Sequence, residues 1–450
     1  MRFRLALPTL LLLILGPYAG ANVESVSREI PRPAELQRDI NFWIRVYSEI
    51  TTAQGFLHDD RNLAIVYEKI DLPGEAGSTL RRDGVRNARE RWSNALRGAA
   101  AALEQGGIPD SVDARRVLEL WGSEASPARL RTASESVRFQ LGQADRFREG
   151  LVRSGIWEAH IARTFERLGL PPELAALPHV ESSFNPAAYS KVGAAGMWQF
   201  MRSTGRLYMR VDDVVDERMD PFRATEAAAR LLSDNYQALG SWPLALTAYN
   251  HGTAGMRRAR AAMGTTDFVT IARHYRSPSF GFASRNFYPS FLAALTIDQD
   301  PRRYFGDLVR APELRFHEVE MPGYAAIDTL ERALGVARST LRELNPGLRP
   351  SVWSGLRMVP RGYRLRLPPE RQLSASELAD RIGGALLAGQ SPTRTHLVQE
   401  GDTLYGLARR YGVSRSVIAD LNGLLPTSLL RIGQRLRLPQ PGTARSVAGD

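Results

Sequence analysis

One glutamate of this 450-residue chain occupies a position where a carboxylic acid could act as a proton donor. Glu181 ends the segment 171–181, in which apolar residues recur at helical spacing after two prolines, a typical helix start. Burial and the negative end of a helix both disfavour a charged carboxylate and therefore raise its pKa. A carboxylic acid that remains protonated near neutral pH can protonate a glycosidic oxygen, which is otherwise a poor leaving group. We therefore expect Glu181 to be a general acid.

The residues after Glu181 indicate how a sugar chain could reach it. Residues 182–186 end the helix, and the Gly/Ala/Ser-rich segment 190–196 interrupts the helical pattern. Small residues let another chain approach the backbone closely. A glutamate at a helix end is most often a solvated surface residue, so the argument rests on the residues around Glu181.

Three separated blocks of sequence occur in the order typical of one enzyme family. They are Glu181-Ser182-Ser183-Phe184, Ala188-x-Ser190-x-x-Gly193-Ala194-x-Gly196-x-x-Gln199-x-Met201 and Ala248-Tyr249-Asn250-x-Gly252. Together they resemble the signature of the Slt-type lytic transglycosylases, lysozyme-like enzymes that act on peptidoglycan. Residues 216–221 and 244–250 are similar to the branch of membrane-bound lytic murein transglycosylases, and the resemblance covers about residues 42–306. It implies a lysozyme-like domain, which we place at residues 151–306.

The resemblance implies a reaction with one catalytic carboxyl group and no cofactor. Glu181 would protonate the oxygen between N-acetylmuramic acid and N-acetylglucosamine. As a carboxylate it would then accept the proton of the muramic C6 hydroxyl, so that a 1,6-anhydro ring closes without water. Tyr249 would donate a hydrogen bond that orients Glu181. His179 and His251 flank the motifs without further ligands at metal-binding spacing, so we interpret both as structural and expect no metal site. The other implied site residues line the sugar site (Ser190, Gln199, Trp198 and Gly196) or support it (Asn250).

Three of the implied site residues also have a structural interpretation. Tyr249 could be a core tyrosine with a satisfied hydroxyl group, and Trp198 could equally be an ordinary core tryptophan. Gly196 could mark a place where the backbone approaches substrate or one where it packs tightly. One family feature is absent, because Ala283 stands where relatives carry a glutamate that contacts substrate. Subsite detail could therefore differ from that of relatives.

Two other functions stay open on the sequence. A hydrolysing muramidase would need a second carboxylate about 5–5.5 Å from the first for retention, or about 6.5–9.5 Å for inversion. Asp213, Asp216 and Glu226 are the candidates, although the acidic residues 212–220 are more typical of helix caps and ion pairs. A non-catalytic wall-binding protein is the other alternative, and the intact signature residues argue against it.

The C-terminal third contains an internal repeat. Residues 330–345 align with residues 407–422, and both copies then reach the sequence Arg-Leu-Arg-Leu-Pro, at 364–368 and 435–439. A repeat of this kind indicates duplicated modules. The second copy is predicted to form a strand, two helices and a closing strand, which make up a small βααβ unit. Ser414 is predicted to cap the second helix.

The second copy resembles a LysM domain over residues 395–440, which implies that it binds glycans containing N-acetylglucosamine. The implied binding residues are Gly401, Asp402, Thr403, Leu404 and Asn422. The first copy, a degenerate LysM-like unit at 316–368, lacks the Gly-Asp-Thr-Leu element. The role of this first unit could equally be glycan binding or docking to the rest of the chain.

The remaining segments complete the predicted domain organisation. Residues 1–21 have the basic start, the apolar run and the small residues of a signal peptide, and the run is too short for a membrane span. Residues 22–150 are predicted to form a helical extension that serves packing. A linker over residues 369–394 separates the two C-terminal copies, and residues 441–450 are expected to be a flexible tail.

The amino-acid composition limits the possible cellular locations of the protein and the classes of partner that it could bind. The chain has no cysteine, which excludes disulfides, thiolate chemistry, Cys-based zinc sites and a lipidated N-terminal cysteine. Its net charge of +11 favours an anionic partner, and predicted export makes peptidoglycan glycan strands the expected partner rather than nucleic acid. We expect no transmembrane anchor in the mature chain, and a periplasmic location, free or peripheral to wall or membrane. The expected fold is mostly α, with a lysozyme-like (α+β) catalytic domain, an N-terminal helical extension and C-terminal βααβ modules.

Overall fold

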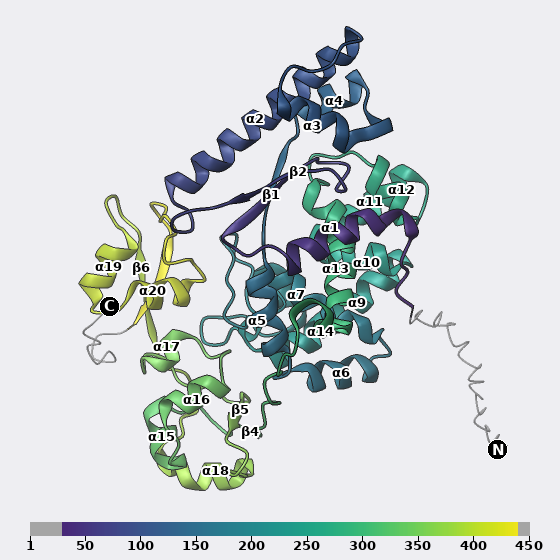
Figure 1. Cartoon of the computed structure of the whole chain (residues 1–450). Helices are drawn as coiled ribbons and strands as arrows, with labels where there is room; N and C mark the ends of the chain where they lie inside the picture. Colours follow the sequence, from purple (N-terminus) through teal and green to yellow (C-terminus); the bar gives the residue numbers. More distant parts are fainter. Residues whose placement is uncertain (1–28, 440–450) are drawn as a thin grey trace, which may run out of the picture.

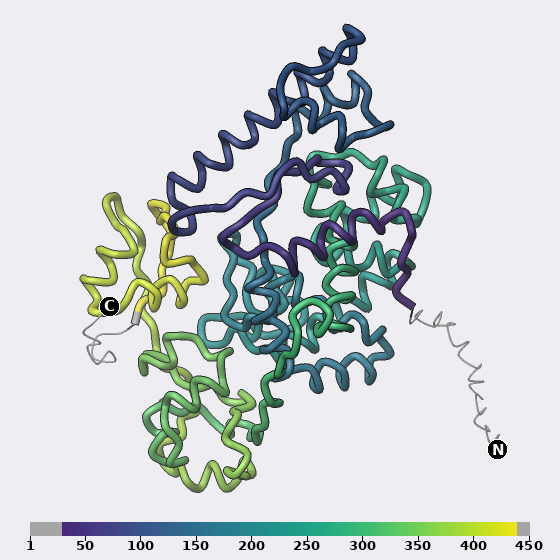
Figure 2. Tube along the Cα trace, viewed as in Figure 1, coloured from purple at the N-terminus to yellow at the C-terminus, as the bar shows by residue number. Residues whose placement is uncertain are grey.

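The computed structural model of the chain describes residues 29–439. Figures 1 and 2 show a central helical body, a lobe formed by N-terminal residues, and two small units formed by C-terminal residues. No helix within residues 29–439 is both long enough and apolar enough to cross a lipid bilayer. The predicted signal peptide at 1–21 and tail at 441–450 lie outside the described residues. Helices form most of the regular structure, which confirms the mostly α fold.

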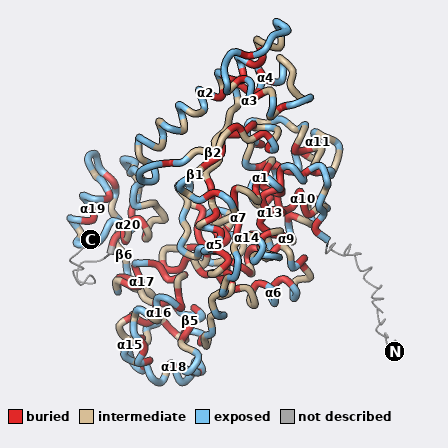
Figure 3. The backbone as a smooth tube through the Cα atoms, viewed as in Figure 1, coloured by how far each residue is buried: buried red, intermediate tan, exposed pale blue. Residues whose placement is uncertain are grey.

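The central body is built from helices that share one hydrophobic core. Helix α13 (Phe282–Gln299) packs against α1 (Gln37–Ser48), α7 (Leu177–Ser182) and α10 (Trp242–His251), and Figure 3 shows buried residues along these helices. Because α1 belongs to this core, residues before 151 complete the central body. Its other helices are α5 (Ala144–Ser154), α6 (Glu158–Arg167), α8 (Arg202–Tyr208), α9 (Pro221–Leu239), α11 (Thr253–Met263), α12 (Phe268–His274), α14 (Pro301–Phe305) and the 3-10 turns η1 (Ala34–Leu36), η3 (Pro172–Ala176) and η4 (Glu217–Met219).

The N-terminal lobe contains a sheet that the sequence did not predict. Three antiparallel strands, β1 (Gln54–His58), β2 (Val66–Asp71) and β3 (Arg138–Leu141), pair in the order β2-β1-β3. The expectation of a helical extension over residues 22–150 is wrong in this part. These strands are short, and β3 pairs with a strand far away in the sequence, so local periodicity does not reveal them. The helices of the lobe are α2 (Thr79–Glu104), α3 (Val112–Trp121), α4 (Pro127–Ser134) and the turn η2 (Gly122–Glu124).

The two C-terminal units have the predicted βααβ order. In the first C-terminal unit (residues 317–387), β4 (His317–Glu320) pairs with β5 (Arg364–Leu367), and α15 (Ile327–Leu334) and α16 (Arg338–Leu344) lie between them in sequence. In the second C-terminal unit (residues 393–439), β6 (Thr393–Leu397) pairs with β7 (Arg435–Pro439), and α19 (Leu404–Tyr411) and α20 (Arg415–Asn422) lie between them. The Ser414 hydroxyl caps α20 as predicted.

The repeat extends to individual hydrogen bonds. The side-chain amide of Asn345 donates to the carbonyl of Arg366 at 2.8 Å and accepts from its N–H at 2.9 Å. Asn422 makes the same two bonds with Arg437, at 2.8 and 2.6 Å. In each unit an asparagine at the end of the second helix therefore fastens that helix to the closing strand.

The segment 369–394 is not the open linker that was expected. It contains the helix α18 (Ala375–Ile382), which begins with a capping box at Ser374. Leu378 and Ile382 are buried in the core of the first C-terminal unit, and Leu387 forms a β-bridge with Tyr324. The Pro/Ala/Gly/Ser composition of the segment concealed a short amphipathic helix. The first C-terminal unit also contains the short helix α17 (Pro350–Trp353) and the turn η5 (Gly383–Ala385).

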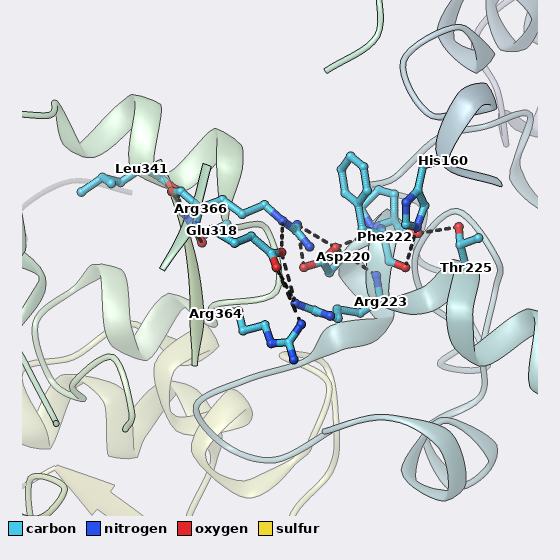
Figure 4. A network of polar contacts seen from close by, with 11 residues as sticks. His160, Asp220, Phe222, Arg223, Thr225, Glu318, Leu341, Arg364 and Arg366 are labelled. Carbon is cyan, nitrogen blue, oxygen red and sulfur yellow. Dashed lines mark hydrogen bonds and ion pairs between the residues drawn. The ribbon is translucent and has the colours of Figure 1, made fainter. Parts of the chain in front are cut away.

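A buried ion cluster joins the first C-terminal unit to the central body (Figure 4). The Arg366 guanidinium donates to both carboxylate oxygens of Asp220, at 2.9 and 2.8 Å, and to Glu318 at 3.0 Å. It also lies 4.6 Å from the centre of the Phe222 ring. Arg223 donates to the same Glu318 carboxylate at 3.1 Å. Because charges this deeply buried need such partners, the cluster fixes the unit on the body.

Candidate active site

Glu181 lies in the short helix α7, which the central body holds firmly. The 3-10 turn η3 precedes α7, so the single helix expected from the sequence is divided in two. Helix α7 packs against α13 and α5, and its residues Leu177 and His179 are buried. The helix ends at Ser182 and is followed by Ser183, whose φ of 52° is left-handed. A side chain on such a well-packed element has a defined position.

Burial gives the Glu181 carboxyl group the pKa of a proton donor. It raises the pKa from 4.5 to about 8, so the group is mostly protonated near neutral pH. Burial is the cause of this shift, and the carboxyl group makes no hydrogen bond or ion pair with any residue in the range 29–439. The residue as a whole keeps part of its surface exposed. A substrate can therefore reach a protonated carboxylic acid that no protein group occupies.

Two tyrosines lie beside Glu181. Burial is the main cause that raises the pKa of both Tyr249 and Tyr47, and the negative charge that Glu181 would carry raises both further; a hydrogen bond with Ser290 partly offsets the rise at Tyr47. The expected hydrogen bond from Tyr249 to Glu181 is not present, because its hydroxyl donates to the carbonyl of Trp198 at 2.9 Å. Tyr249 therefore ties helix α10 to the signature loop, which we define as residues 188–201. Tyr47 lies in the segment 22–150, which was expected only to serve packing, and no local sequence signal connects α1 with Glu181.

The signature loop contains both polar residues expected to contact sugar. The Ser190 hydroxyl accepts a hydrogen bond from the Ala194 N–H at 2.9 Å, so it closes a turn inside the loop. The Gln199 side-chain NH₂ donates to the carbonyls of Ala188 and Gly196, at 3.3 and 2.8 Å. Its carbonyl oxygen accepts no hydrogen bond from residues 29–439. This oxygen is the Gln199 atom available to a sugar hydroxyl.

Trp198 is a structural residue, which corrects its assignment to the sugar site, whereas a substrate contact by the Gly196 backbone stays a prediction. Trp198 is fully buried, and its indole N–H donates to the Thr225 hydroxyl at 2.9 Å, so it is a core tryptophan that cannot stack on a sugar. A Cβ atom at Gly196 would lie 1.7 Å from the carbonyl oxygen of Arg218. Gly196 therefore marks tight backbone packing, one of the two readings that the sequence allowed.

The remaining residues that the sequence singled out are Asn250 and two histidines. Asn250 is exposed at the end of α10. His179 contacts Asp298 with Nε2 at 3.2 Å and stacks on a phenylalanine ring, and His251 contacts the Ser284 hydroxyl with Nδ1 at 3.1 Å. These contacts agree with the structural interpretation of both histidines.

Backbone strain is concentrated at this site. Within residues 29–439, the non-glycine residues with positive φ are Ser183 (52°), Phe184 (55°) and Gln199 (48°). Two directly follow α7, and the third is in the signature loop. Such conformations persist only where the surrounding structure imposes them, and they tend to cluster at functional sites.

The three carboxylates considered for a hydrolase are engaged with arginines. Asp213 lies 3.3 Å from both Arg357 and Arg437. Asp216 lies 2.7 Å from Arg218, and Glu226 lies 3.8 Å from an arginine of α6. Asp220 caps helix α9, accepting from the Phe222 N–H at 3.0 Å. The acidic residues 212–220 thus make helix caps and ion pairs, as the sequence suggested.

The residues predicted to bind glycan in the second C-terminal unit mostly hold its fold. Asp402 accepts from the His396 ring at 2.7 Å and from the Gln399 N–H at 2.8 Å. Thr403 caps α19, and Leu404 is buried, so a direct glycan contact by the Leu404 side chain is wrong. Asn422 fastens α20 to β7, while Gly401 is exposed with a φ of 82°. Glycan contacts by Gly401, Asp402, Thr403 and Asn422 stay predictions.

Comparison with protein families agrees with this arrangement. The transglycosylase SLT domain family matches residues 161–271, which include α7, the signature loop and α10. The LysM domain family matches residues 396–439, within the second C-terminal unit. The chain carries an SLT domain and a LysM domain. In the SLT domain, Tyr249 and Glu181 come from helices that the match includes, whereas Tyr47 lies outside it.

Individual proteins are also similar to this chain. Membrane-bound lytic murein transglycosylase D of Escherichia coli is 30% identical over 303 residues, which cover 64% of this chain and 65% of that protein. A putative tributyltin chloride resistance protein of Alteromonas is 32% identical over 102 residues, covering 22% of this chain and 49% of that protein. The chain thus spans just under two thirds of the length of the first relative.

Two solved structures of lytic transglycosylases are also similar. An inactive mutant of Slt from Pseudomonas aeruginosa is 20% identical with a TM-score of 0.28, covering 50% of this chain and 34% of that one. The 70 kDa soluble lytic transglycosylase of Escherichia coli is 20% identical with a TM-score of 0.29, covering 51% and 44%.

Proposed function

We propose that this chain is a peptidoglycan lytic transglycosylase in which Glu181 is the single acid–base group. The observation that carries the proposal is a carboxyl group in an SLT domain that has no protein partner among residues 29–439 and whose pKa burial raises to about 8. The sugar-facing oxygen of Gln199 and the strained backbone around α7 support the same site. The lytic murein transglycosylase relative supports the class of substrate.

The proposed reaction uses the same carboxyl group twice. Glu181 gives its proton to the glycosidic oxygen between N-acetylmuramic acid and N-acetylglucosamine, and the bond from the muramic C1 to that oxygen breaks. The muramic C6 oxygen then bonds to C1, and the Glu181 carboxylate takes the C6 hydroxyl proton. Intramolecular attack has a large effective-molarity advantage over attack by water. Burial disfavours the charged carboxylate, so the second step returns Glu181 to its favoured protonated form.

The nature of the products tests this proposal. We expect digestion of purified peptidoglycan to give fragments that end in 1,6-anhydromuramic acid, each lighter by one water than a reducing end. In heavy-oxygen water the new ends should carry no label, as measured by mass spectrometry, because water does not enter the reaction. A hydrolytic muramidase digested in parallel provides the labelled control. Labelled reducing ends as the main product would require a second catalytic carboxylate and would reject the lytic mechanism.

The pH dependence of cleavage follows from the raised pKa of Glu181. The proton donor is present below its pKa of about 8 and is lost as the pH rises through that value. We therefore expect kcat/KM on a soluble glycan to fall about tenfold per pH unit above pH 8, because kcat/KM reports ionisation of the free enzyme. Circular dichroism at each pH should show that the fold persists. A decline already centred near the ordinary glutamate value would show that Glu181 is not buried as a proton donor.

For the second C-terminal unit, we propose binding of glycans that contain N-acetylglucosamine. The LysM match supports this role, and the first C-terminal unit, which is fixed on the central body, is assigned to docking instead. We further propose that the chain acts on the wall from the periplasm. The wall-directed SLT and LysM domains and the membrane-bound relative support that location.

A further inference from the structure

We propose that Arg349 is a positioning residue that couples the C-terminal units to the signature loop of the active site. The inference rests on the proposed function, since it concerns how the sugar-binding loop is held. Its basis is a continuous chain of buried charged contacts that runs from the second C-terminal unit to two main-chain carbonyls of that loop.

Arg349 connects three parts of the molecule. It belongs to the first C-terminal unit, and only 10% of its side chain is exposed. One guanidinium nitrogen donates to the Asp216 carboxylate of the central body at 3.1 Å. A second guanidinium nitrogen donates to the Asp420 carboxylate, on helix α20 of the second C-terminal unit. Removal of Arg349 therefore breaks both contacts at once.

Asp216 also binds Arg218, which extends the network toward the signature loop. The Arg218 side chain is fully buried, and it donates to the two Asp216 oxygens at 2.9 and 2.7 Å. Asp216 is thus enclosed between two guanidinium groups. In a low-dielectric interior such groups interact strongly, so a change at one end of the network shifts the others.

Arg218 holds the signature loop directly. Its remaining guanidinium nitrogen donates to the carbonyls of Gly193 and Phe200, at 2.9 and 3.0 Å. Gly196 packs against the Arg218 main-chain carbonyl. The loop between these carbonyls includes Gln199, whose free oxygen was assigned to the sugar site. The position of Arg218 thus determines the position of a substrate-binding residue.

The main chain makes this docking specific. Asp216 donates from its N–H to the carbonyl of Gly347 at 2.7 Å, and the Arg349 N–H donates to the carbonyl of Val214 at 3.0 Å. Val214 and Val215, which belong to the central body, are buried in the core of the first C-terminal unit. The first C-terminal unit therefore packs against the segment that contains both Asp216 and Arg218, and it forms main-chain hydrogen bonds with that segment.

The experiment replaces Arg349 and uses Arg357 as a matched control. Arg357 is buried to a similar extent and pairs with Asp213 at 3.3 Å in the same acidic segment, but Asp213 does not bond to the signature loop within residues 29–439. In the full-length chain, Arg349→Gln should lower kcat on a short soluble glycan about tenfold with little change in KM, whereas Arg357→Gln should not. Hydrogen exchange should be faster at the amides of Ala194 and Phe200 in Arg349→Gln alone.

A second variant keeps the test possible if the first does not fold, and two results would overturn the proposed coupling. If Arg349→Gln does not fold, Asp420→Asn, which removes only the charge of the outer contact, takes its place and should show the same two changes at smaller size. Unchanged kcat and unchanged loop exchange would overturn the coupling, as would equal losses in the Arg349 and Arg357 variants, which would indicate general loss of docking. Failure of the proposed function is separate, because it would appear as activity that does not depend on Glu181.

Discussion

Replacing Glu181 by glutamine is expected to lower cleavage of purified peptidoglycan by at least about a hundredfold, the usual scale for acid–base catalysis. Glutamine keeps the shape of the side chain but cannot donate the proton that the leaving oxygen needs. Asp213 and Asp216 could not substitute for it, since both are held by arginines. Release of soluble fragments, measured by mass spectrometry, provides the readout. Near-normal turnover by this variant would end the assignment of Glu181.

A matched control lies in the preceding turn. Glu173→Gln changes a partly buried glutamate of η3 that is not part of the proposed site, and activity should stay close to normal. The Glu181 variant should also be at least as stable as the parent. Because burial raises the folded-state pKa of Glu181 to about 8, the parent loses stability as the pH rises from about 4.5 to about 8, by up to about 1.4 kcal/mol for each pH unit in that interval. The glutamine variant lacks this loss, so unfolding cannot explain its inactivity.

Replacing Arg366 by methionine is expected to destabilise the first C-terminal unit by about 3–5 kcal/mol, the cost of breaking a buried ion pair from one side. The side chain of Arg366 is 2% exposed, and its loss leaves Asp220 buried without its cation (Figure 4). Methionine retains the apolar stem, so the loss reflects mainly the charge. Hydrogen exchange of the β4–β5 amides measures the opening free energy of this unit without requiring the whole chain to unfold in one step.

The repeat supplies the control for this prediction. Arg437 occupies the same place in the second C-terminal unit, but its side chain is 53% exposed and lies 3.3 Å from Asp213. Arg437→Met should therefore cost less than about 1 kcal/mol. Adding Asp220→Asn to Arg366→Met should restore part of the lost stability, because asparagine still caps α9 without leaving an unpaired charge. Equal effects of the two arginine variants would show that burial does not distinguish the pairs.

The sequence by itself identified the features that depend on neighbouring residues. The position of Glu181 at the end of a short apolar helix could be predicted from local spacing, and the blocks around Gln199 and Tyr249 were identified by their resemblance to a known family. The βααβ repeat and the Ser414 cap could also be predicted from local spacing. The hydrogen bonds by which Asn345 and Asn422 fasten helix to strand were found only in the structure. Local periodicity and capping act within a few residues, so sequence reasoning can detect them.

Only the tertiary structure decided which side chains face the site and which serve packing. Trp198 and Leu404 are core residues, although motif position suggested contact with sugar. Tyr47 is close enough for the charge of Glu181 to raise its pKa, although it belongs to a helix more than a hundred residues earlier. The segment 369–394 proved to contain a packed helix. Arg349 joins Asp216 and Asp420 across three parts of the chain. Burial and ion pairing arise when distant segments share one low-dielectric interior, and the spacing of residues along a sequence does not contain that information.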